Sequence, residues 1–291
     1  MPGTCLIIAN PISGSGRGRR DAPGLEAGLR RNGFGVELFW TDAPGAARSA
    51  AEAADPEQVS VILSVGGDGT LNEVANGVGD KNIPIALFPT GTANVLAQEY
   101  GIPPSVERVC EIIAAGKTVR LDVGLAAGRR FVLFIGAGYD AAVVAAVAAK
   151  RTGRITKLHY VGPVLKALAT YRFPEMEVVV DDQAAGRATS ALVCNVHSYG
   201  GPFEIAEGAD PTDGLFDVCL LRGRRRRDMV RYFWGGMRHR LFRYQDTARL
   251  RGKVIELRCP AAVPLQADGD FVGELPVRIE LLRARLPILV P

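Results

Sequence analysis

Paired cysteines, internal repeats and low-complexity linkers are absent from this sequence. The 291 residues include five cysteines, which lie far apart and match neither a zinc site nor a disulfide scaffold. We therefore expect free thiols in a reducing compartment. The first eleven residues, MPGTCLIIANP, have no basic stretch before a short apolar run, so we expect no cleaved signal. With 47% hydrophobic residues, the chain is not disordered or fibrous and is long enough for two domains.

Only one hydrophobic run has the length of a membrane span. Residues 131–149, FVLFIGAGYDAAVVAAVAA, contain a single charge, Asp140. Gly136 and Gly138 interrupt the run, and its second half is rich in alanine. This pattern predicts a buried strand, a turn and a helix rather than a membrane span.

The remaining apolar segments indicate two kinds of domain. The first 120 residues alternate between strand and helix patterns, as in an open α/β sheet with parallel strands that is covered on both faces. The later residues show shorter strands and closer turns. In the first part we expect strands at 5–9, 35–40, 59–65 and 83–88 and helices at 19–32, 45–53, 70–78, 93–100 and 105–115. In the second we expect strands at 131–135, 176–180, 190–196, 215–221, 253–257 and 277–282 and helices at 141–150 and 158–169.

These patterns predict an α/β domain over residues 1–121 and a β-rich substrate domain over residues 122–285. Residues 286–291 form a tail, and its return to the sheet of the first domain stays open. Because no long linker separates the two domains, we expect a ligand site in a cleft between them.

The stretch SVGGDGTLNE, residues 64–73, joins a predicted strand to a predicted helix. Its glycines, Gly66, Gly67 and Gly69, let phosphate oxygens approach backbone N–H groups at the start of the helix. Asp68 would repel a phosphate unless a metal cation, a proton or a hydroxyl lies between them, as when Mg²⁺-bound ATP gives up a phosphoryl group. Alternatively, Asp68 is an ordinary turn residue that makes local hydrogen bonds.

The helix after this loop carries a start signal of its own. Thr70 and Glu73 have the spacing of a capping box, in which the glutamate satisfies N–H groups at the start of its own helix. The pattern predicts a structural role for Glu73.

Two further glycine turns follow predicted strands. ANPISGSGRGRR, residues 9–20, lacks the Gly-Lys-Ser/Thr of a Walker A loop, and its glycine spacing misses the dinucleotide fingerprint. FPTGTANVLA, residues 88–97, offers the hydroxyls of Thr90 and Thr92. Because the carboxyl ends of successive parallel strands face one crevice, the three turns together predict one phosphate site.

The ordered motifs of the chain resemble the diacylglycerol kinase catalytic-domain family, which includes sphingosine kinases and bacterial lipid kinases. GGDGT alone is shared with NAD kinases and 6-phosphofructokinases, whereas the ordered set is specific and covers nearly the whole chain. The motifs are NPISG (10–14), TDAPGAA (41–47), GGDGTLNEVANG (66–77), PTGTANVLA (89–97), LDVG (121–124), DPTDGLFDV (210–218) and QADGD (266–270).

The resemblance implies an ATP-binding α/β domain, a C-terminal β-sandwich and transfer of the γ-phosphoryl group to a lipid hydroxyl, with Mg²⁺. Asp213 and the backbone of Leu215 match a metal position of bacterial members, and Asp268 and Asp270 match the family's Asp-Gly-Glu, whose acids are candidates for the general base. By position, the nucleotide contacts would come from Asn10, Thr41, Gly66, Gly67, Asp68, Gly69, Thr70, Leu71, Asn72 and Thr92.

Two departures from the family pattern affect these roles. Asp270 replaces a glutamate and is one methylene shorter, so either its carboxylate reaches differently or Asp268 is the base. Val95 stands where metal-binding bacterial members often have aspartate, so whether the metal site is intact stays open. Since an alcohol attacks only when its proton is accepted, we expect Asp268 and Asp270 to handle the acceptor hydroxyl and Asp68 to manage Mg²⁺ and phosphate.

The basic charge of the chain is local. Between Arg222 and Arg251 there are eleven arginines and two aspartates, a local charge of +9 in a chain of net charge +4. Aromatic residues beside these arginines, such as Phe233 and Trp234, are typical of a helix on an anionic membrane. Nucleic acid is a less favoured partner because no base-reading motif is present. The remaining alternative is a helix that packs its aromatics inward with solvated arginines.

The sequence therefore predicts a cytoplasmic lipid kinase that associates peripherally with membranes. Diacylglycerol and a sphingoid base both stay open as acceptors, and so does the oligomeric state. A kinase for a soluble substrate such as NAD is the second hypothesis. A lipid-binding protein without catalysis is the third.

Overall fold

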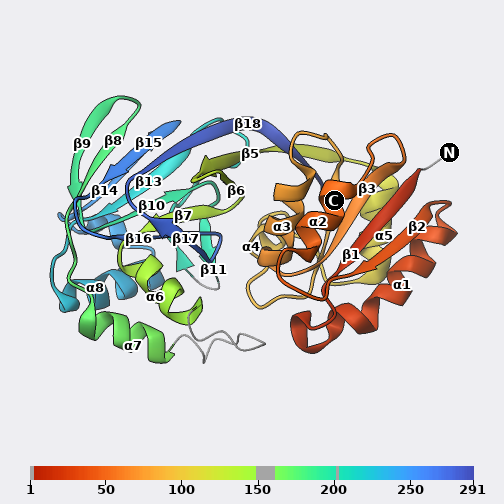
Figure 1. Cartoon of the computed structure of the whole chain (residues 1–291), viewed down its shortest axis with the longest axis horizontal. Coiled ribbons are helices and arrows are strands. Elements are labelled where there is room, and N and C mark those ends of the chain that lie inside the picture. Colours follow the sequence, from red (N-terminus) through yellow and green to blue (C-terminus); the bar gives the residue numbers. More distant parts are fainter. Residues whose placement is uncertain (1–2, 149–160, 201–202) are drawn as a thin grey trace. The chain divides into compact units, whose positions relative to one another are not determined.

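Two compact units make up the chain, and the computed structural model describes its residues 3–148, 161–200 and 203–291 (Figure 1). The first unit comprises Met1–Asp122 and Arg283–Pro291, and the second comprises Val123–Leu282. The chain passes from the first unit to the second within strand β5, Thr118–Ala126, and returns within strand β18, Val277–Leu289.

The first unit is an α/β domain with a parallel sheet, as the sequence predicts. Its elements are β1 (Thr4–Ala9), η1 (Ser13–Ser15), α1 (Arg17–Arg31), β2 (Gly35–Trp40), α2 (Ala46–Ala53), β3 (Val59–Gly66), α3 (Asp68–Val78), β4 (Ile85–Pro89), α4 (Val95–Glu99) and α5 (Val106–Ala115). The strands lie in the order β2-β1-β3-β4-β18, and neighbouring strands are parallel. Helix α1 packs against α5, and α2 packs against α3 (Figure 1). The central strands are buried because helices cover the sheet.

The second unit is an antiparallel β-sandwich, which also agrees with the prediction. One sheet has the order β14-β13-β10-β7-β16-β17, and β18-β15-β8-β9 form the other. The strands are β6 (Arg129–Phe131), β7 (Phe134–Ala137), β8 (Met176–Val180), β9 (Gln183–Ala188), β10 (Ser190–Cys194), β11 (Ser198–Gly200), β12 (Phe203–Glu204), β13 (Phe216–Leu221), β14 (Thr247–Gly252), β15 (Val254–Arg258), β16 (Pro264–Ala267) and β17 (Asp270–Glu274).

Apolar side chains from both sheets fill the sandwich. Val193 and Val218 of one sheet belong to the same buried cluster as Val178 and Ile255 of the other. Both sheets alternate inward and outward side chains, so this cluster is the core of the unit. The helices of this unit are α6 (Tyr139–Ala148), α7 (Val161–Thr170), α8 (Arg226–Met237) and the short η3 (Leu241–Arg243).

Within the apolar run at 131–149, β7, Gly138 and α6 form the predicted strand, turn and helix. Gly138 has a φ of +110° between β7 and α6, a conformation that favours glycine. In the parts of the chain that the structure describes, no helix is long and apolar enough to cross a membrane. The ends of the predicted helices at 141–150 and 158–169, residues 149–150 and 158–160, lie outside the described residues.

One predicted strand is wrong. The segment 131–135 does not form a single strand, because β6 ends at Phe131 and β7 begins at Phe134. At the break, the backbone N–H groups of Val132 and Leu133 donate to the carboxylate of Asp268 instead of to a neighbouring strand.

Candidate active site

Three glycine-containing loops meet at the carboxyl ends of parallel strands in the first unit. We call residues 10–16 after β1 the first loop, residues 66–69 after β3 the second loop and residues 90–94 after β4 the third loop. The N–H of Thr90 donates to the carbonyl of Gly66 at 2.9 Å, and the Thr90 hydroxyl donates to Oγ of Ser13 at 2.8 Å. The sequence-predicted phosphate loops therefore lie side by side.

The close approach of the loops requires glycine at particular positions. A Cβ atom on Gly14 would lie 2.0 Å from the carbonyl oxygen of Thr90, and its φ of +58° is unfavourable for other residues. A Cβ on Gly91 would lie 2.5 Å from Cα of Gly67. The three loops thus pack closely, with backbone against backbone at Gly14 and Gly91.

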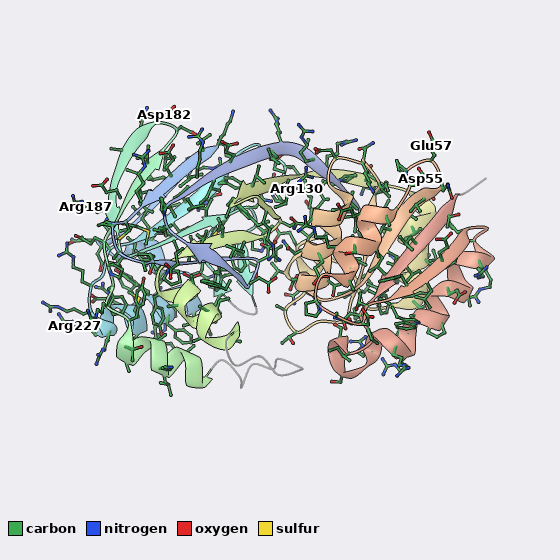
Figure 2. The ribbon with its side chains drawn as sticks, in the orientation of Figure 1. Asp55, Glu57, Arg130, Asp182, Arg187 and Arg227 are labelled. Atoms are coloured by element: carbon green, nitrogen blue, oxygen red, sulfur yellow. The ribbon has the colours of Figure 1, made fainter. Side chains whose placement is uncertain are left out.

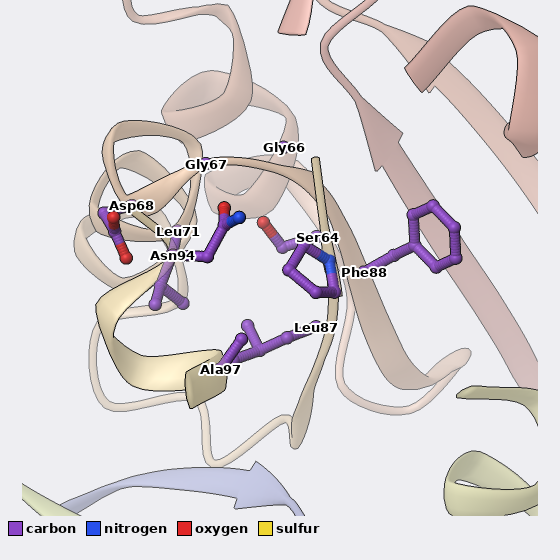
Figure 3. A pocket seen from close by; sticks show the side chains of 10 residues that line it. Ser64, Gly66, Gly67, Asp68, Leu71, Leu87, Phe88, Asn94 and Ala97 are labelled. Carbon is purple, nitrogen blue, oxygen red and sulfur yellow. The ribbon is translucent and has the colours of Figure 1, made fainter. Parts of the chain in front are cut away.

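A pocket lies between the second and third loops (Figure 3). Helix α3 begins at its wall without a side-chain cap, so the positive end of the helix dipole faces this region. The uncapped helix start suits a phosphate group. The lining residues are Ser64, Gly66, Gly67, Asp68, Leu71, Leu87, Phe88, Pro89, Asn94 and Ala97.

Asp68 lies in the first turn of α3 and reaches the third loop. Its Oδ1 accepts a hydrogen bond from the N–H of Val95 at 2.8 Å, and Val95 is the first residue of α4. The carboxylate therefore ties the second loop to the start of α4. This contact engages Oδ1, and the charge of the carboxylate remains at the wall of the pocket.

Glu73 does not complete the predicted capping box. Its two carboxylate oxygens accept hydrogen bonds from the N–H groups of Gly45 and Ala47 at 3.0 and 3.1 Å. These groups belong to the start of α2, which packs against α3. Glu73 is therefore a structural residue, as expected, but it caps a neighbouring helix instead of its own.

The other predicted nucleotide contacts differ in exposure. Asn10 and Thr41 follow the adjacent strands β1 and β2 at the same sheet edge, and Thr92 is exposed on the third loop. Leu71 and Asn72 are 4% and 1% exposed. The Leu71 side chain lines the pocket, and the N–H of Leu71 donates to the carbonyl of Gly67 within α3. Gly69 is exposed, and Thr70 is buried beneath Gly66, where a Cβ would lie 2.3 Å from the Thr70 hydroxyl.

Asn94 is a functional candidate that the sequence analysis did not select. It has a φ of +50°, and its side chain accepts from the N–H of Gly91 at 2.8 Å and donates to the carbonyl of Gly91 at 2.9 Å. This pair of bonds fixes the third loop beside Gly67 (Figure 3). Asparagine tolerates the left-handed region, so the Gly-Thr-Ala-Asn pattern carried a signal for this turn.

In the second unit, the carboxylate of Asp268 accepts hydrogen bonds from three backbone N–H groups. Its Oδ2 accepts from Val132 at 2.8 Å, and its Oδ1 accepts from Leu133 at 2.9 Å and Phe134 at 3.0 Å. These three donors take up most of the roughly four acceptor positions of a carboxylate. Asp268 therefore supports the chain between β6 and β7.

Asp270 begins β17 and is partly exposed. Its side chain is 35% exposed, and Oδ2 accepts from Nη2 of Arg129 at 2.8 Å. Partly exposed ion pairs of this kind contribute about 0–1 kcal/mol. A carboxylate in this setting can exchange partners with a substrate hydroxyl. Arg129 was not identified from the sequence, since it lies far from Asp270 along the chain.

The predicted metal residues adopt a local turn. Oδ1 of Asp213 accepts from the N–H of Leu215 at 3.0 Å, and Oδ2 accepts from Arg251. Among the described residues, no group of three or more His, Cys, Asp or Glu is arranged to hold a metal ion. Because both carboxylate oxygens of Asp213 already accept hydrogen bonds from protein donors, this turn does not fit the metal site that the family resemblance implies.

Comparison with known proteins gives two family matches. Residues 4–126 match the diacylglycerol kinase catalytic domain, and residues 134–290 match the YegS C-terminal NAD kinase beta sandwich-like domain. A diacylglycerol kinase from Mycobacterium tuberculosis is 28% identical over 302 residues, which cover 99% of this chain and 96% of the relative. A diacylglycerol kinase from Bacillus subtilis is 25% identical, with 98% and 95% covered.

Solved structures share the fold. A crystal structure described as a diacylglycerol kinase from Bacillus anthracis str. Sterne has a TM-score of 0.73 at 20% identity, covering 99% of this chain and 97% of that chain. A second crystal structure from the same organism reaches a TM-score of 0.80 at 22% identity, with the same coverage. Both family matches, in the order that the motifs predict, show that the chain belongs to the diacylglycerol kinase family with a YegS-type C-terminal domain.

Proposed function

We propose that the protein transfers the γ-phosphoryl group of Mg²⁺-bound ATP to the hydroxyl of a lipid. The packing of the three glycine-containing loops against one another, with Asp68 at the wall of the pocket between the second and third loops, is the observation that carries this proposal. Backbone N–H groups and a helix start are suited to the phosphates, and a carboxylate beside them is suited to a divalent cation. Membership of a kinase family adds the reaction class.

Asp270 is the candidate general base in this proposal. The acceptor O–H gives its proton to the carboxylate, the oxygen forms a bond to the γ-phosphorus, and the bond from that phosphorus to the β,γ-bridging oxygen breaks. The products are ADP and a phosphorylated lipid. Asp268 keeps its three backbone hydrogen bonds throughout, so it positions the segment before β7 and leaves the base role to Asp270.

Labelled ATP tests the acceptor directly. The purified protein is incubated with [γ-³²P]ATP, Mg²⁺ and, in separate reactions, diacylglycerol, sphingosine and NAD. We expect label in the organic phase with a lipid acceptor and none with Asp68→Asn. Label transferred to NAD would instead identify a kinase for a soluble substrate, and ATP left intact with every acceptor would indicate a protein without catalysis.

Helix α8 presents an apolar face that suits a membrane surface. Val230, Phe233 and Trp234 are 45%, 50% and 49% exposed. Their spacing of three and four residues puts them on one side of the helix. Met229 and Tyr232, on the other side, are buried in a satellite cluster. Of the aromatic residues of this helix, Tyr232 is therefore packed inward, and Phe233 and Trp234 are exposed.

Arginines flank this apolar face. Arg227, in the first turn of α8, points outward (Figure 2), and Arg238 lies over the ring of Trp234 with its guanidinium carbon 5.2 Å from the centroid. By contrast, Arg249 and Arg251 on β14 pair with aspartates. We propose that the face of α8, rather than the whole of residues 222–251, contacts anionic membranes, where each basic residue contributes about 1 kcal/mol.

Liposome sedimentation tests this surface. The variant with Phe233→Ser and Trp234→Ser is compared with Phe39→Ser, a control for loss of an aromatic ring that is 38% exposed on β2. We expect wild type and control to pellet with anionic liposomes at low salt, the double variant to stay in solution, and salt to weaken binding. Failure of the wild-type protein to pellet at any salt concentration would remove the membrane role.

A further inference from the structure

Two aspartates and two arginines form a cluster at the start of β13 in the second unit. Asp217 is completely buried and stands opposite Arg251 in the antiparallel register of β13 and β14. Nε of Arg249 donates to Oδ1 of Asp217 at 2.7 Å, and Nε of Arg251 lies 3.8 Å from the same oxygen. A carboxylate buried to this degree requires a compensating positive charge, which the two guanidinium groups supply.

Arg251 also reaches the turn that precedes β13. Its Nη2 donates to Oδ2 of Asp213, whose Oδ1 accepts from the N–H of Leu215. The donors of a guanidinium form a rigid planar fork, so one side chain can face two carboxylates from different edges. Arg251 therefore bridges Asp213 in the turn and Asp217 in the strand.

This turn is where the family resemblance implies a metal ion, and the residues present suit a guanidinium instead. Mg²⁺ requires oxygen ligands in near-octahedral geometry. Both oxygens of Asp213 already accept hydrogen bonds, and Oδ1 of Asp217 faces Arg249 and Arg251. Of the four carboxylate oxygens, Oδ2 of Asp217 alone is buried without a hydrogen-bond partner among the described residues, and one such oxygen falls short of the ligand set that Mg²⁺ requires. Two fixed positive charges beside the carboxylates also oppose the entry of a divalent cation.

We infer that the guanidinium of Arg251 takes the place of a structural metal ion in this chain, so that the second unit orders the Asp213 turn without a divalent cation. A guanidinium stays charged at every pH at which the protein is folded and cannot be removed by a chelator. The inference concerns the second unit alone and does not depend on the proposed phosphoryl transfer. Any Mg²⁺ requirement of the protein then comes from the nucleotide.

Thermal unfolding without nucleotide tests the metal half of the inference. Wild type and Asp213→Asn are each melted in EDTA and in about 5 mM MgCl₂. The measured quantity is the Mg²⁺-induced shift in Tm of the wild type minus that of the variant. We expect a difference within about 1 °C. A wild-type shift that exceeds that of Asp213→Asn by about 3 °C or more would show a metal ion bound at Asp213 and overturn the inference.

The arginine half is tested by Arg251→Met. The control is Arg187→Met, which removes a guanidinium paired with Glu177 on the exposed hairpin of β8 and β9. We expect Arg251→Met to lower the Tm by about 3 °C or more beyond the control. Arg251→Lys should recover only part of the loss, because an ammonium lacks the planar fork. Equal Tm values for Arg251→Met and Arg187→Met contradict the bridge, and the wild-type metal titration decides the inference if Arg251→Met does not fold.

Discussion

The carboxylate of Asp68 accepts a hydrogen bond from the N–H of Val95 at 2.8 Å. This bond joins the second loop to the first residue of α4 and gives the acidic residue of a phosphate loop a structural partner. The positive end of a helix dipole partly offsets the negative charge of Asp68. An acid can therefore stand within an anion-binding loop before any cation is bound.

Asp68→Asn should preserve the fold and abolish most turnover. Asparagine keeps an oxygen for the N–H of Val95 and caps helices as well as aspartate does, so we expect a Tm within about 2 °C of wild type. The lost charge removes the group proposed to hold Mg²⁺ and the phosphates, and kcat should fall by about 100-fold or more. Differential scanning fluorimetry and the labelled-ATP assay give the two values.

Asp68→Ala is the matched comparison, because it removes the hydrogen bond as well as the charge. It should be less stable than Asp68→Asn by about 1 kcal/mol in urea unfolding. Full turnover in Asp68→Asn would mean that Asp68 serves only as a cap.

The first unit was predictable from the sequence because its strands are continuous apolar runs between helices. Residues 59–65 needed only local information to be identified as a buried strand, and β3 spans Val59–Gly66. Local sequence patterns do not identify hydrogen-bond partners that lie far away along the chain. Glu73 matched a capping box by spacing, but α2 packs on α3 and supplies the N–H groups of Gly45 and Ala47.

The candidate site was predictable only in part. The convergence of the three loops follows from the order of parallel strands. The hydrogen bonds that Asp268 accepts do not follow from strand order, because their donors, Val132 to Phe134, lie more than a hundred residues earlier in the chain. The contacts of Arg251 with Asp213 and Asp217 were equally unpredictable. In the sequence, Arg251 lies in a segment whose many arginines predict a basic surface.

Gly14→Ala should weaken both stability and ATP binding. The new Cβ would meet the carbonyl oxygen of Thr90 at 2.0 Å, so the first loop must move away from the third loop. The control is Gly16→Ala, at a φ of +86° with no atom within 4 Å, which carries a backbone penalty without a clash. We expect Gly14→Ala to lose about 1–3 kcal/mol more in urea unfolding than Gly16→Ala.

Isothermal titration calorimetry with ATP measures the predicted loss of nucleotide affinity. Because the first loop packs against the third loop, which borders the pocket of the proposed function, the Kd of Gly14→Ala should rise about tenfold relative to Gly16→Ala, equivalent to about 1.4 kcal/mol. Equal affinities for the two variants would exclude the first loop from nucleotide binding.

Asp268 and Asp270 should respond oppositely to replacement by asparagine. In Asp268→Asn, an amide NH₂ faces N–H donors that need an acceptor, which costs about 1–3 kcal/mol of unfolding free energy. Asp270→Asn loses a partly exposed pair with Arg129, worth about 0–1 kcal/mol. Its turnover should nevertheless fall by about 100-fold, because the proposed base is gone.

Urea unfolding and turnover under saturating lipid measure the two effects. Asp270→Glu, which restores the family residue, should retain activity and serves as the control. A stable Asp268→Asn without activity, beside a fully active Asp270→Asn, would transfer the base role to Asp268.

Asp140 is a buried carboxylate whose removal should stabilise the protein at neutral pH. Its Oδ2 accepts from the hydroxyl of Tyr199 and from Nε2 of Gln266, both at 3.1 Å. Its Oδ1 is buried and makes no hydrogen bond within the described residues. Burial raises the pKa of Asp140 above its ordinary value of 3.8, although hydrogen bonds from Gln266, from the backbone of Ala141 and Asp140 and from Tyr199 act in the opposite direction.

The sign of the pH dependence follows from this raised pKa. A carboxyl group with a higher pKa in the folded than in the unfolded state stabilises the fold below the unfolded pKa, and this contribution is lost as pH rises through the folded pKa. Asp140→Asn keeps an oxygen for Tyr199 and Gln266 and carries no charge at any pH. The variant should therefore exceed wild type in unfolding free energy at pH 7, and the gap should close as the pH falls toward about 4. Urea unfolding of both proteins across this range measures the gap, and a wild type that is more stable at pH 7 would mean that the ionised carboxylate has a stabilising partner.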